Sequence, residues 1–233
     1  MKGKLYLIPS TLGDYSPQTV LPYTVTDRIQ TIRRYFVEDI RSARRFLSAA
    51  GLNGRIPELE LWEISEHTSR EEIEKYALIL GQEDAGLISE AGLPAVADPG
   101  AMLVEMAHSR DIEVVPMVGP SSLMMALMSS GLNGQNFAFN GYLPVKADAR
   151  RAAVLALEKT ATTRGQSQII IETPYRNDAL LKDILSVCKP QTKLCIAADI
   201  TCESQMIKTR SIAQWNKEPI SIGKRPCVFI IGR

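Results

Sequence analysis

Four loops hold the residue types that could do chemistry in this chain. They span residues 8–14, 38–41, 89–100 and 118–122, and each follows a short apolar run typical of a β-strand. The longest loop places two glycines, two prolines and the carboxylates of Glu90 and Asp98 between a strand and a helix. Small residues let the backbone approach a ligand, and exposed amides and carbonyls can then bind it. Because open α/β sheets bind ligands beyond the carboxyl ends of their strands, the four loops together indicate a cleft.

The elements that must position these loops alternate along the first half of the chain. We expect strands over residues 5–8, 35–38, 59–64, 86–89 and 113–116 and helices over residues 41–50, 70–80 and 101–109. Strands and helices in alternation predict a largely parallel sheet that is covered by helices.

The second half repeats this pattern less regularly. A turn at residues 119–122 leads into an expected helix that ends near Ser130, where Gly131 suits a left-handed C-terminal cap. We expect strands over residues 137–139, 168–172, 194–198 and 227–231 and helices over residues 147–159 and 177–188. Residues 202–225 suggest a hairpin-like or meandering addition, so we predict a mixed sheet here. With a junction near Val118, the sequence predicts two α/β domains, residues 1–118 and 119–233.

The composition is that of an ordinary globular protein rather than a disordered or fibrous one. Of the 233 residues, 45% are hydrophobic and 23% are charged. No apolar run approaches the ~20 residues that span a bilayer, and the first residues do not resemble a signal peptide. We therefore expect a cytoplasmic protein with no membrane partner.

Basic and acidic residues are nearly equal in number over the whole chain, but they are unevenly distributed along it. The 27 basic and 26 acidic side chains give a net charge of +1, so any nucleic-acid site must be local. Residues 27–55 contain only three acids against seven arginines, namely Arg28, Arg33, Arg34, Arg41, Arg44, Arg45 and Arg55. A solvated helix face and a site for an anionic partner are two interpretations of this run, and both stay open.

Several common sites are excluded by their missing motifs. The four cysteines, Cys188, Cys195, Cys202 and Cys227, form no C-x-x-C pair, and the two histidines lie in polar stretches. We therefore expect no metal site, and we expect the thiols to be reduced and buried. The chain also lacks the glycine patterns of a Rossmann dinucleotide site and of a P-loop, and it has no G-x-S-x-G elbow.

The loops themselves resemble those of a known family. Residues 89–100, Ser-Glu-Ala-Gly-Leu-Pro-Ala-Val-Ala-Asp-Pro-Gly, resemble the S-D-A-G-T-P-x-x-x-D-P-G signature of the tetrapyrrole (corrin/porphyrin) methylase superfamily. The similar branch is that of the small-subunit ribosomal RNA cytidine 2′-O-methyltransferases. Residues 38–47 look like its E-D-T-R-x-x-x-x-L-L, 115–122 like V-P-x-x-G-P-S-A, 140–144 like x-G-F-L-P, and 172–176 like E-S-P-H-R. The resemblance runs from about Leu5 to Ala198, most of the chain.

The resemblance implies an S-adenosylmethionine-dependent methyltransferase with a fold of two α/β domains. Its N-terminal sheet would be mainly parallel and its C-terminal sheet mixed, with the cofactor in the cleft between the domains of a homodimer. Carried over by position, the cofactor contacts would come from Pro9, Ser10, Gly92, Leu93, Pro94, Val96, Ser121 and Ser122. Glu172, Thr173 and Pro174 would border the same pocket. Backbone groups and serine hydroxyls suffice to hold adenine and ribose, so such a site needs few charges.

Methyl transfer to an alcohol also requires a group that takes up the proton. Glu38, Asp39, Glu90 and Glu172 are the carboxylates nearest the motif loops, and any of them would serve as the base if burial raised its pKa. The alternative is that they cap helices or pair with arginines. We expect Arg41 and Arg176 to bind a phosphate or carboxylate of the substrate.

The sequence departs from the family pattern mainly at positions expected to face the substrate. Asp14 replaces a neutral asparagine, Glu90 replaces an aspartate, and Ala198 and Cys202 stand where the ribosomal RNA enzymes carry an arginine and a lysine. Three functions therefore remain: methylation of RNA or another anionic acceptor, including 2′-O-methylation of ribosomal RNA; methylation of a small, tetrapyrrole-like molecule; and cofactor binding without catalysis.

Overall fold

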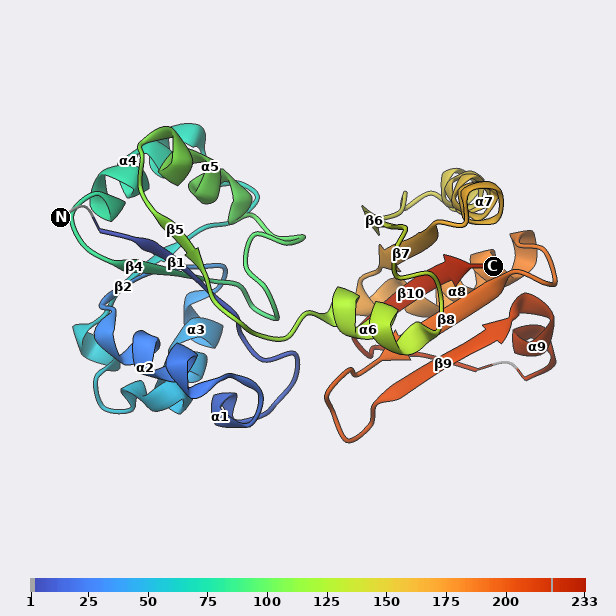
Figure 1. Cartoon of the computed structure of the whole chain (residues 1–233), viewed down its shortest axis with the longest axis horizontal. Helices are drawn as coiled ribbons and strands as arrows, with labels where there is room; N and C mark the ends of the chain where they lie inside the picture. The colour runs from blue at the N-terminus through green and yellow to red at the C-terminus, as the bar shows by residue number, and fades with distance from the viewer. Residues whose placement is uncertain (1–2, 219) are drawn as a thin grey trace. The chain divides into compact units, whose positions relative to one another are not determined.

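The protein consists of two compact units in the computed structural model, which describes residues 3–218 and 220–233 (Figure 1). One unit ends at Ser121, and the other runs from Ser122 to Arg233. Each unit has its own sheet and its own core, and each is described by itself below.

The first unit is built on a parallel sheet, as the sequence predicts. Its strands have the order β3-β2-β4-β1-β5 and are β1 (Leu5–Ile8), β2 (Arg34–Val37), β3 (Glu60–Glu63), β4 (Ala85–Ile88) and β5 (Val114–Pro116). Every neighbouring pair runs parallel. The carboxyl ends of all these strands therefore meet at one edge of the sheet, which we call the carboxyl edge of the first unit.

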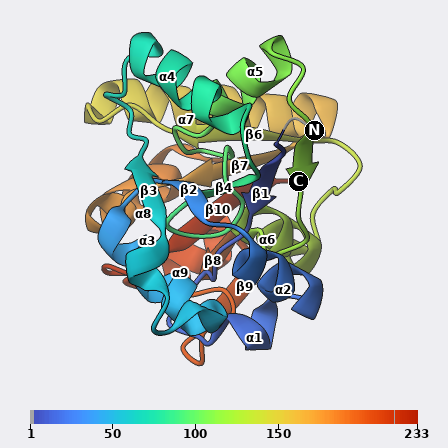
Figure 2. The same cartoon turned by 90° about the vertical axis from the view of Figure 1, so that its left-hand side faces the viewer.

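Helices cover both faces of this sheet. They are α1 (Pro17–Val20), α2 (Tyr23–Thr31), α3 (Ile40–Leu47), α4 (Arg70–Leu80) and α5 (Ala101–Ser109). Figures 1 and 2 show α1–α3 on one face and α4 and α5 on the other. The two cores follow the alternation of side chains along β2, because Tyr35 and Val37 pack under α2 and α3 whereas Phe36 packs under α4 and α5.

Two of these helices, α1 and α2, were not expected from the sequence. In α2 only Val25, Thr26 and Ile29 are buried, and the residue before it, Pro22, makes no side-chain cap. By contrast, α4 begins with a capping box in which Ser69 and Glu72 satisfy each other's backbone amides. A weak apolar stripe without a cap is hard to recognise in the sequence.

The second unit contains a mixed sheet, which confirms that expectation. Its strands have the order β6-β7-β10-β8-β9 and are β6 (Phe137–Tyr142), β7 (Ser167–Ile171), β8 (Lys193–Ala198), β9 (Met206–Ser211) and β10 (Cys227–Gly232). β6 and β7 run parallel, whereas β10 is antiparallel to β7 and β8, and β9 is antiparallel to β8. The carboxyl ends of β6, β7 and β8 therefore share an edge with the start of β10.

The helices of the second unit are α6 (Ser122–Ser130), α7 (Ala147–Arg164), α8 (Asn177–Val187) and α9 (Ile212–Lys217). The segment 202–225 forms a hairpin with β8, as expected, but it also contains α9, which was not. Trp215 of α9 is buried and donates from Nε1 to the carbonyl of Leu194 at 2.9 Å. The helix also begins with a capping box of Ser211 and Gln214 and buries Ile212, but it is too short to show a periodic pattern.

The structure corrects the expectation that all four cysteine thiols are buried. Cys188, Cys195 and Cys227 are buried, and burial raises the pKa of Cys188 and of Cys227 to about 12. Cys202, in the turn after β8, is only half-buried. Within residues 3–218 and 220–233, no helix is long and apolar enough to cross a membrane, and no cluster of three or more histidine, cysteine or acidic side chains suits a metal ion.

Candidate active site

Three loops meet at the carboxyl edge of the first unit. The amide of Ser10, after β1, donates to the carbonyl of Gly92, after β4, at 2.9 Å, and the Ser10 hydroxyl donates to the carbonyl of Ser89 at 3.1 Å. The loop after β5 comes equally close, since a Cβ on Gly119 would lie 2.2 Å from Cγ of Pro9. Gly92 adopts φ +76°, a conformation that favours glycine. The sequence thus places glycine where the backbones of separate loops touch.

The long loop after β4 is folded around one carboxylate. Oδ1 of Asp98 accepts from the amides of Ala95 at 2.8 Å and of Gly100 at 2.9 Å. Ala95 and Ala97 both adopt φ 63°, which is uncommon outside glycine, so this loop holds backbone strain. Burial raises the pKa of Asp98, and its Oδ2 has no hydrogen-bond partner within the described residues. The side chain of Asp98 therefore shapes the loop.

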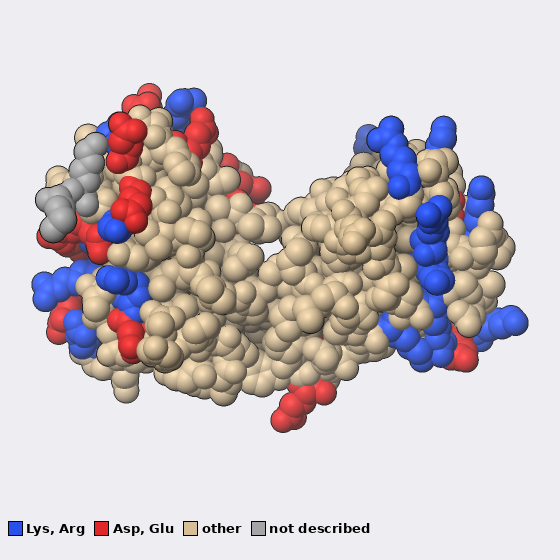
Figure 3. All heavy atoms as spheres, in the orientation of Figure 1, with Lys and Arg blue, Asp and Glu red and all other residues tan. Residues whose placement is uncertain are grey.

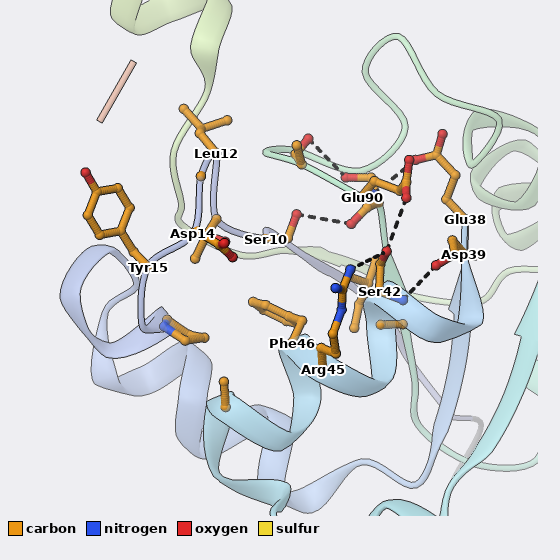
Figure 4. Close-up of a pocket in the computed structure, with 18 residues that line it drawn as sticks. Ser10, Leu12, Asp14, Tyr15, Glu38, Asp39, Ser42, Arg45, Phe46 and Glu90 are labelled. Atoms are coloured by element: carbon orange, nitrogen blue, oxygen red, sulfur yellow. Dashed lines mark hydrogen bonds between the residues drawn. The ribbon is translucent and has the colours of Figure 1, made fainter. Parts of the chain in front are cut away.

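A cavity of about 380 Å³ lies at the same edge, between α3 and the loops after β1 and β4 (Figure 4). Its walls come from three segments of the first unit. They are Ser10, Thr11, Leu12, Gly13, Asp14, Tyr15 and Pro17; Glu38, Asp39, Ser42, Ala43, Arg45, Phe46 and Ala49; and Ile88, Ser89, Glu90 and Ala91.

Helix α3 supplies one wall of the cavity because of how it begins. Asp39 caps the helix, and its Oδ1 accepts from the amide of Ser42 at 2.6 Å. From this cap, helical spacing carries Ser42 and Phe46 onto one face, and Figure 4 shows Ser42 pointing to Glu90 and Phe46 pointing into the cavity. These side chains were missed in the sequence, although counting three and seven residues on from Asp39 would have found them.

The pKa values of the two adjacent carboxylates at the start of α3 are shifted in opposite directions. Burial raises the pKa of Glu38, whose Oε2 accepts from the amide of Glu90 at 3.0 Å. The amide of Ser42 holds the pKa of Asp39 below its usual value. Asp39 therefore stays ionised as a cap, whereas Glu38 is the carboxylate better suited to take up a proton.

A polar chain links Glu90 to Arg45 across the cavity. The hydroxyl of Ser42 donates to Oε1 of Glu90 at 3.3 Å, and NH2 of Arg45 donates to the same hydroxyl at 3.3 Å (Figure 4). The cavity therefore combines one apolar wall, at Phe46, with hydroxyl, carboxylate and guanidinium groups. Such a mixture orients a polar ligand while excluding water from part of it.

The predicted site residues of the first unit are only partly brought together. Ser10, Glu38 and Asp39 line the cavity, and Pro9 and Gly92 form the loop contacts behind it. Arg41 is exposed on α3 and is not among the lining residues. Leu93, Pro94 and Val96 lie further along the loop after β4, and Ser121 ends this unit.

The predicted site residues of the second unit gather after β7, apart from Ser122, which begins α6. The Glu172 side chain is fully buried, and its Oε1 accepts from the amide of Thr173 at 2.7 Å and from Nε of Arg176 at 2.9 Å. Its Oε2 has no partner among the residues described. Arg176 is thus paired with Glu172, as the alternative interpretation of these residues anticipated.

The arginine run of residues 28–55 does not form one surface. Arg28, Arg34 and Arg55 lie near the amino ends of the strands, 3.9, 3.3 and 3.7 Å from carboxylates of Asp84, Glu60 and Glu58. Three others, Arg41, Arg44 and Arg45, lie on α3 at the carboxyl edge. A shallow groove is bordered by Arg44 and Arg45, and it shares Arg45 and Ala49 with the cavity. Only these three arginines are near the candidate site.

Comparison with known proteins identifies the family. A relative from Neisseria meningitidis serogroup B is 32% identical over 203 residues, which cover 85% of this chain and 64% of that protein. A relative from Xylella fastidiosa is 31% identical over 85% of this chain and 69% of its own length, and one from Pseudomonas aeruginosa is 28% identical over 98% and 78%. All three are named ribosomal RNA small subunit methyltransferase I. This chain belongs to that family.

The solved structures agree with this assignment at the level of the fold. A conserved hypothetical protein from Aeropyrum pernix K1 superimposes with a TM-score of 0.68 at 12% identity, over 100% of this chain and 85% of that one. A uroporphyrin-III C-methyltransferase from Thermus thermophilus, solved with S-adenosyl homocysteine, gives 0.57 at 16% identity over 99% and 98%. The fold is therefore that of the tetrapyrrole methylases, which confirms the resemblance. No protein-family model matches the chain, and the chain spans 64% of the length of the Neisseria relative.

Proposed function

We propose that this chain is an S-adenosylmethionine-dependent methyltransferase that acts on the RNA of the small ribosomal subunit, at a ribose 2′-hydroxyl. The observation that carries the proposal is the loop cluster of Ser10, Gly92 and Gly119, built for close backbone contact in a chain of this family. The relatives are named for methylation of the same RNA, and a neighbour in fold was solved with the demethylated cofactor.

The loops of the first unit fit a ligand such as S-adenosylmethionine. Their glycines allow close approach, and one of the two carboxylates in the long loop, Asp98, is turned to its own backbone. The amides, carbonyls and hydroxyls of these loops suit adenine and ribose. We assign cofactor contacts to Pro9, Ser10, Gly92, Leu93, Pro94, Val96, Ser121, Ser122 and Thr173. The bound cofactor would supply an electrophilic methyl group on its sulfonium.

Within this function, Glu38 is the general base. The Glu38 carboxylate would take up the proton of the acceptor hydroxyl when that oxygen receives the methyl group that the bound cofactor would supply. Burial, which raises the pKa of Glu38, makes this carboxylate more basic than an exposed one. Phe46 and Leu12 restrict water around the reacting groups, and Arg45 is placed to hold a phosphate beside the acceptor.

We also propose that the protein works as a homodimer in the cytoplasm, as the resemblance implies. Twofold dimers are the commonest soluble oligomers, which supports the proposal in general terms. Sedimentation at micromolar concentration tests it: a species of twice the 25.7 kDa chain mass is expected, and monomer alone would contradict it.

A second candidate is a methylase of a small, tetrapyrrole-like molecule. The observation in its favour is that the cavity contains Asp14, Glu38, Asp39 and Glu90, and these four carboxylates do not favour a phosphodiester. Cofactor binding without methyl transfer is the third candidate.

Calorimetry with S-adenosylmethionine and S-adenosyl homocysteine tests the cofactor assignment. Binding is expected for both, because even a weak millimolar site, near −4 kcal/mol, is measurable. No heat with either ligand would remove the basis of the proposed function. Transfer of a labelled methyl group to unmodified small subunits, and not to a tetrapyrrole, then separates the first candidate from the other two.

A further inference from the structure

The two units carry opposite net charge, although the chain as a whole is nearly neutral. The unit that ends at Ser121 has 12 basic and 18 acidic side chains, a formal charge of −6. The unit from Ser122 onward has 15 basic and 8 acidic side chains, a formal charge of +7. In Figure 3 the side chains of Lys and Arg accordingly predominate on the visible face of the unit that contains α7 and α8. An anionic polymer would therefore be attracted to the second unit.

Among the described residues, Tyr175 has the most exposed aromatic ring of this basic unit. Tyr175 lies in the 3₁₀ turn Pro174–Arg176, which follows β7 at the edge where β6, β7 and β8 end. It is 80% exposed, and Nζ of Lys224 lies 5.0 Å from the centroid of its ring. An exposed tyrosine with a cation against it is the combination by which proteins stack and neutralise single-stranded nucleic acid.

Side-chain hydrogen bonds from the start of α8 hold the segment of Lys224 beside the turn of Tyr175. Asn177, the first residue of α8, is fully buried, and its Nδ2 donates to the carbonyls of Gly223 at 3.2 Å and of Arg225 at 2.7 Å. These carbonyls flank Lys224 on both sides. Asp178 adds a second tie, since it accepts from the amide of Ile222 and the hydroxyl of Ser221, each at 2.7 Å. The backbone segments that carry Tyr175 and Lys224 are thus fixed next to each other, which lowers the entropic cost of placing the two side chains on a ligand.

We propose that Tyr175 and Lys224 form a platform on which an unpaired base of the RNA substrate stacks, while the basic side chains of the second unit contact its phosphates. The proposal rests on the proposed function for RNA as the substrate. Because every base has a π-face, the platform favours unpaired RNA without selecting its sequence. A duplex hides the faces of its bases, so it gains only the phosphate contacts.

Fluorescence anisotropy with a labelled, unpaired oligoribonucleotide of mixed sequence at low salt tests the platform. Tyr175→Ala is expected to weaken binding by roughly ten- to a hundredfold, the usual effect of losing one stacked base, whereas Tyr175→Phe keeps the ring and binds as the parent does. The matched control is Tyr23→Ala, because Tyr23 is 75% exposed but belongs to the first unit. It is expected to leave RNA affinity unchanged.

The lysine is tested through the dependence of affinity on salt. Lys224→Gln is expected to lower the slope of log affinity against log salt by about 0.7, the contribution of one phosphate on a single strand. The exposed Lys75→Gln, on α4 of the first unit, serves as the control and leaves the slope unchanged.

The outcomes separate this inference from the proposed function. Equal RNA affinity of Tyr175→Ala and the parent overturns the platform, as does a parent that prefers duplex RNA. A parent that binds S-adenosyl homocysteine but no RNA overturns the platform and the RNA substrate while leaving the cofactor assignment intact. If Tyr175→Ala weakens S-adenosyl homocysteine as much as RNA, the ring belongs to the cofactor site and the platform is again overturned. A parent that binds neither ligand contradicts the proposed function itself.

Discussion

The two units of this chain are similar in size and share a layered α/β construction, yet they differ in sheet topology, net charge and exposed groups. The first has an all-parallel sheet, a net charge of −6, and a cavity walled by loops that touch backbone to backbone. The second has a mixed sheet, a net charge of +7, and an exposed tyrosine held beside a lysine. The net negative charge of the first unit would repel an RNA chain. The net positive charge of the second unit would attract its phosphates.

The comparison teaches that chemistry and affinity need not come from the same part of a protein. In the proposed function, the first unit performs methyl transfer, with the half-buried carboxylate of Glu38 as the base. The second unit supplies the charge that draws in the substrate. Net charge over the whole chain hides this division, because −6 and +7 cancel almost completely.

The largest expected effect comes from replacing Glu38 in the first unit. Glu38→Gln is expected to lower the rate of methyl transfer by about a hundredfold or more, the usual contribution of a general base, with little change in cofactor affinity. The parent rate should fall as the pH drops through the raised pKa of Glu38, and the variant should lose that limb of the profile. Steady-state kinetics against pH measures both, and the control is Glu203→Gln, an exposed glutamate of the second unit. A variant with the parent's rate and profile would remove Glu38 from the mechanism.

Glycine substitutions test the close contact of the loop of Gly119 with Pro9 in the first unit. Gly119→Ala must push Pro9 away, so we expect a loss of about 1–3 kcal/mol in the free energy of unfolding and a matching loss of cofactor affinity. Gly134→Ala, in the second unit, meets no atom within 4 Å and should change neither quantity. Denaturant melts and calorimetry compare the pair. Equal behaviour of the two variants would contradict the contact that we describe.

Charge reversal on α3 tests how much affinity the first unit contributes. Arg41→Glu combined with Arg44→Glu should weaken RNA binding about tenfold and flatten its salt dependence, because two phosphate contacts near the cavity are lost. Cofactor affinity should hold, since it depends on the loops of Gly92 and Ser121. The control is Arg33→Glu, an exposed arginine just before β2, at the opposite edge of the sheet. Unchanged RNA binding after the double reversal would assign all the electrostatic affinity to the second unit.

The smallest effects are on stability against pH, and they have opposite signs in the two units. The pKa of Glu38 is raised by burial, so its contribution to stability is present below the usual value of 4.5 and is lost as the pH rises through the folded pKa. The pKa of Asp178 is lowered, chiefly by the amide of Ile222, so its contribution is present above 3.8 and is lost as the pH falls through the folded pKa. At neutral pH, Glu38→Gln should therefore raise the Tm slightly and Asp178→Asn should lower it, with both differences vanishing in acid. Thermal melts between pH 3 and 7 measure these shifts, and two shifts of the same sign at neutral pH would contradict the assignment.

Much of the fold could be predicted because it depends on local patterns. The sequence shows the short apolar runs of β1 and β4 and the cap of helix α4. The alternation of such strands and helices predicts a parallel sheet. Helix α9 was missed although Ser211 and Gln214 form a capping box at its start, because six residues show no helical period and Trp215 packs against residues far away in the chain.

The site was predicted less completely for the same physical reason. The loops around Ser10 and Gly92 were found because glycine and serine mark them, whereas Phe46 became part of the cavity only once α3 was in place. The sequence could not divide the arginine run either, since the acids that pair with Arg28 and Arg34, Asp84 and Glu60, lie dozens of residues away. The location of the cofactor between the two domains stays a prediction.

The most direct test of the account is mass spectrometry of small-subunit RNA after incubation with the purified protein and S-adenosylmethionine. The RNA should come from cells that lack this protein, so that its methylation site is empty. We predict one new 2′-O-methylated ribonucleoside with the parent protein and a strongly reduced amount with Glu38→Gln. RNA that gains no methyl group from a parent protein that binds the cofactor would contradict the account.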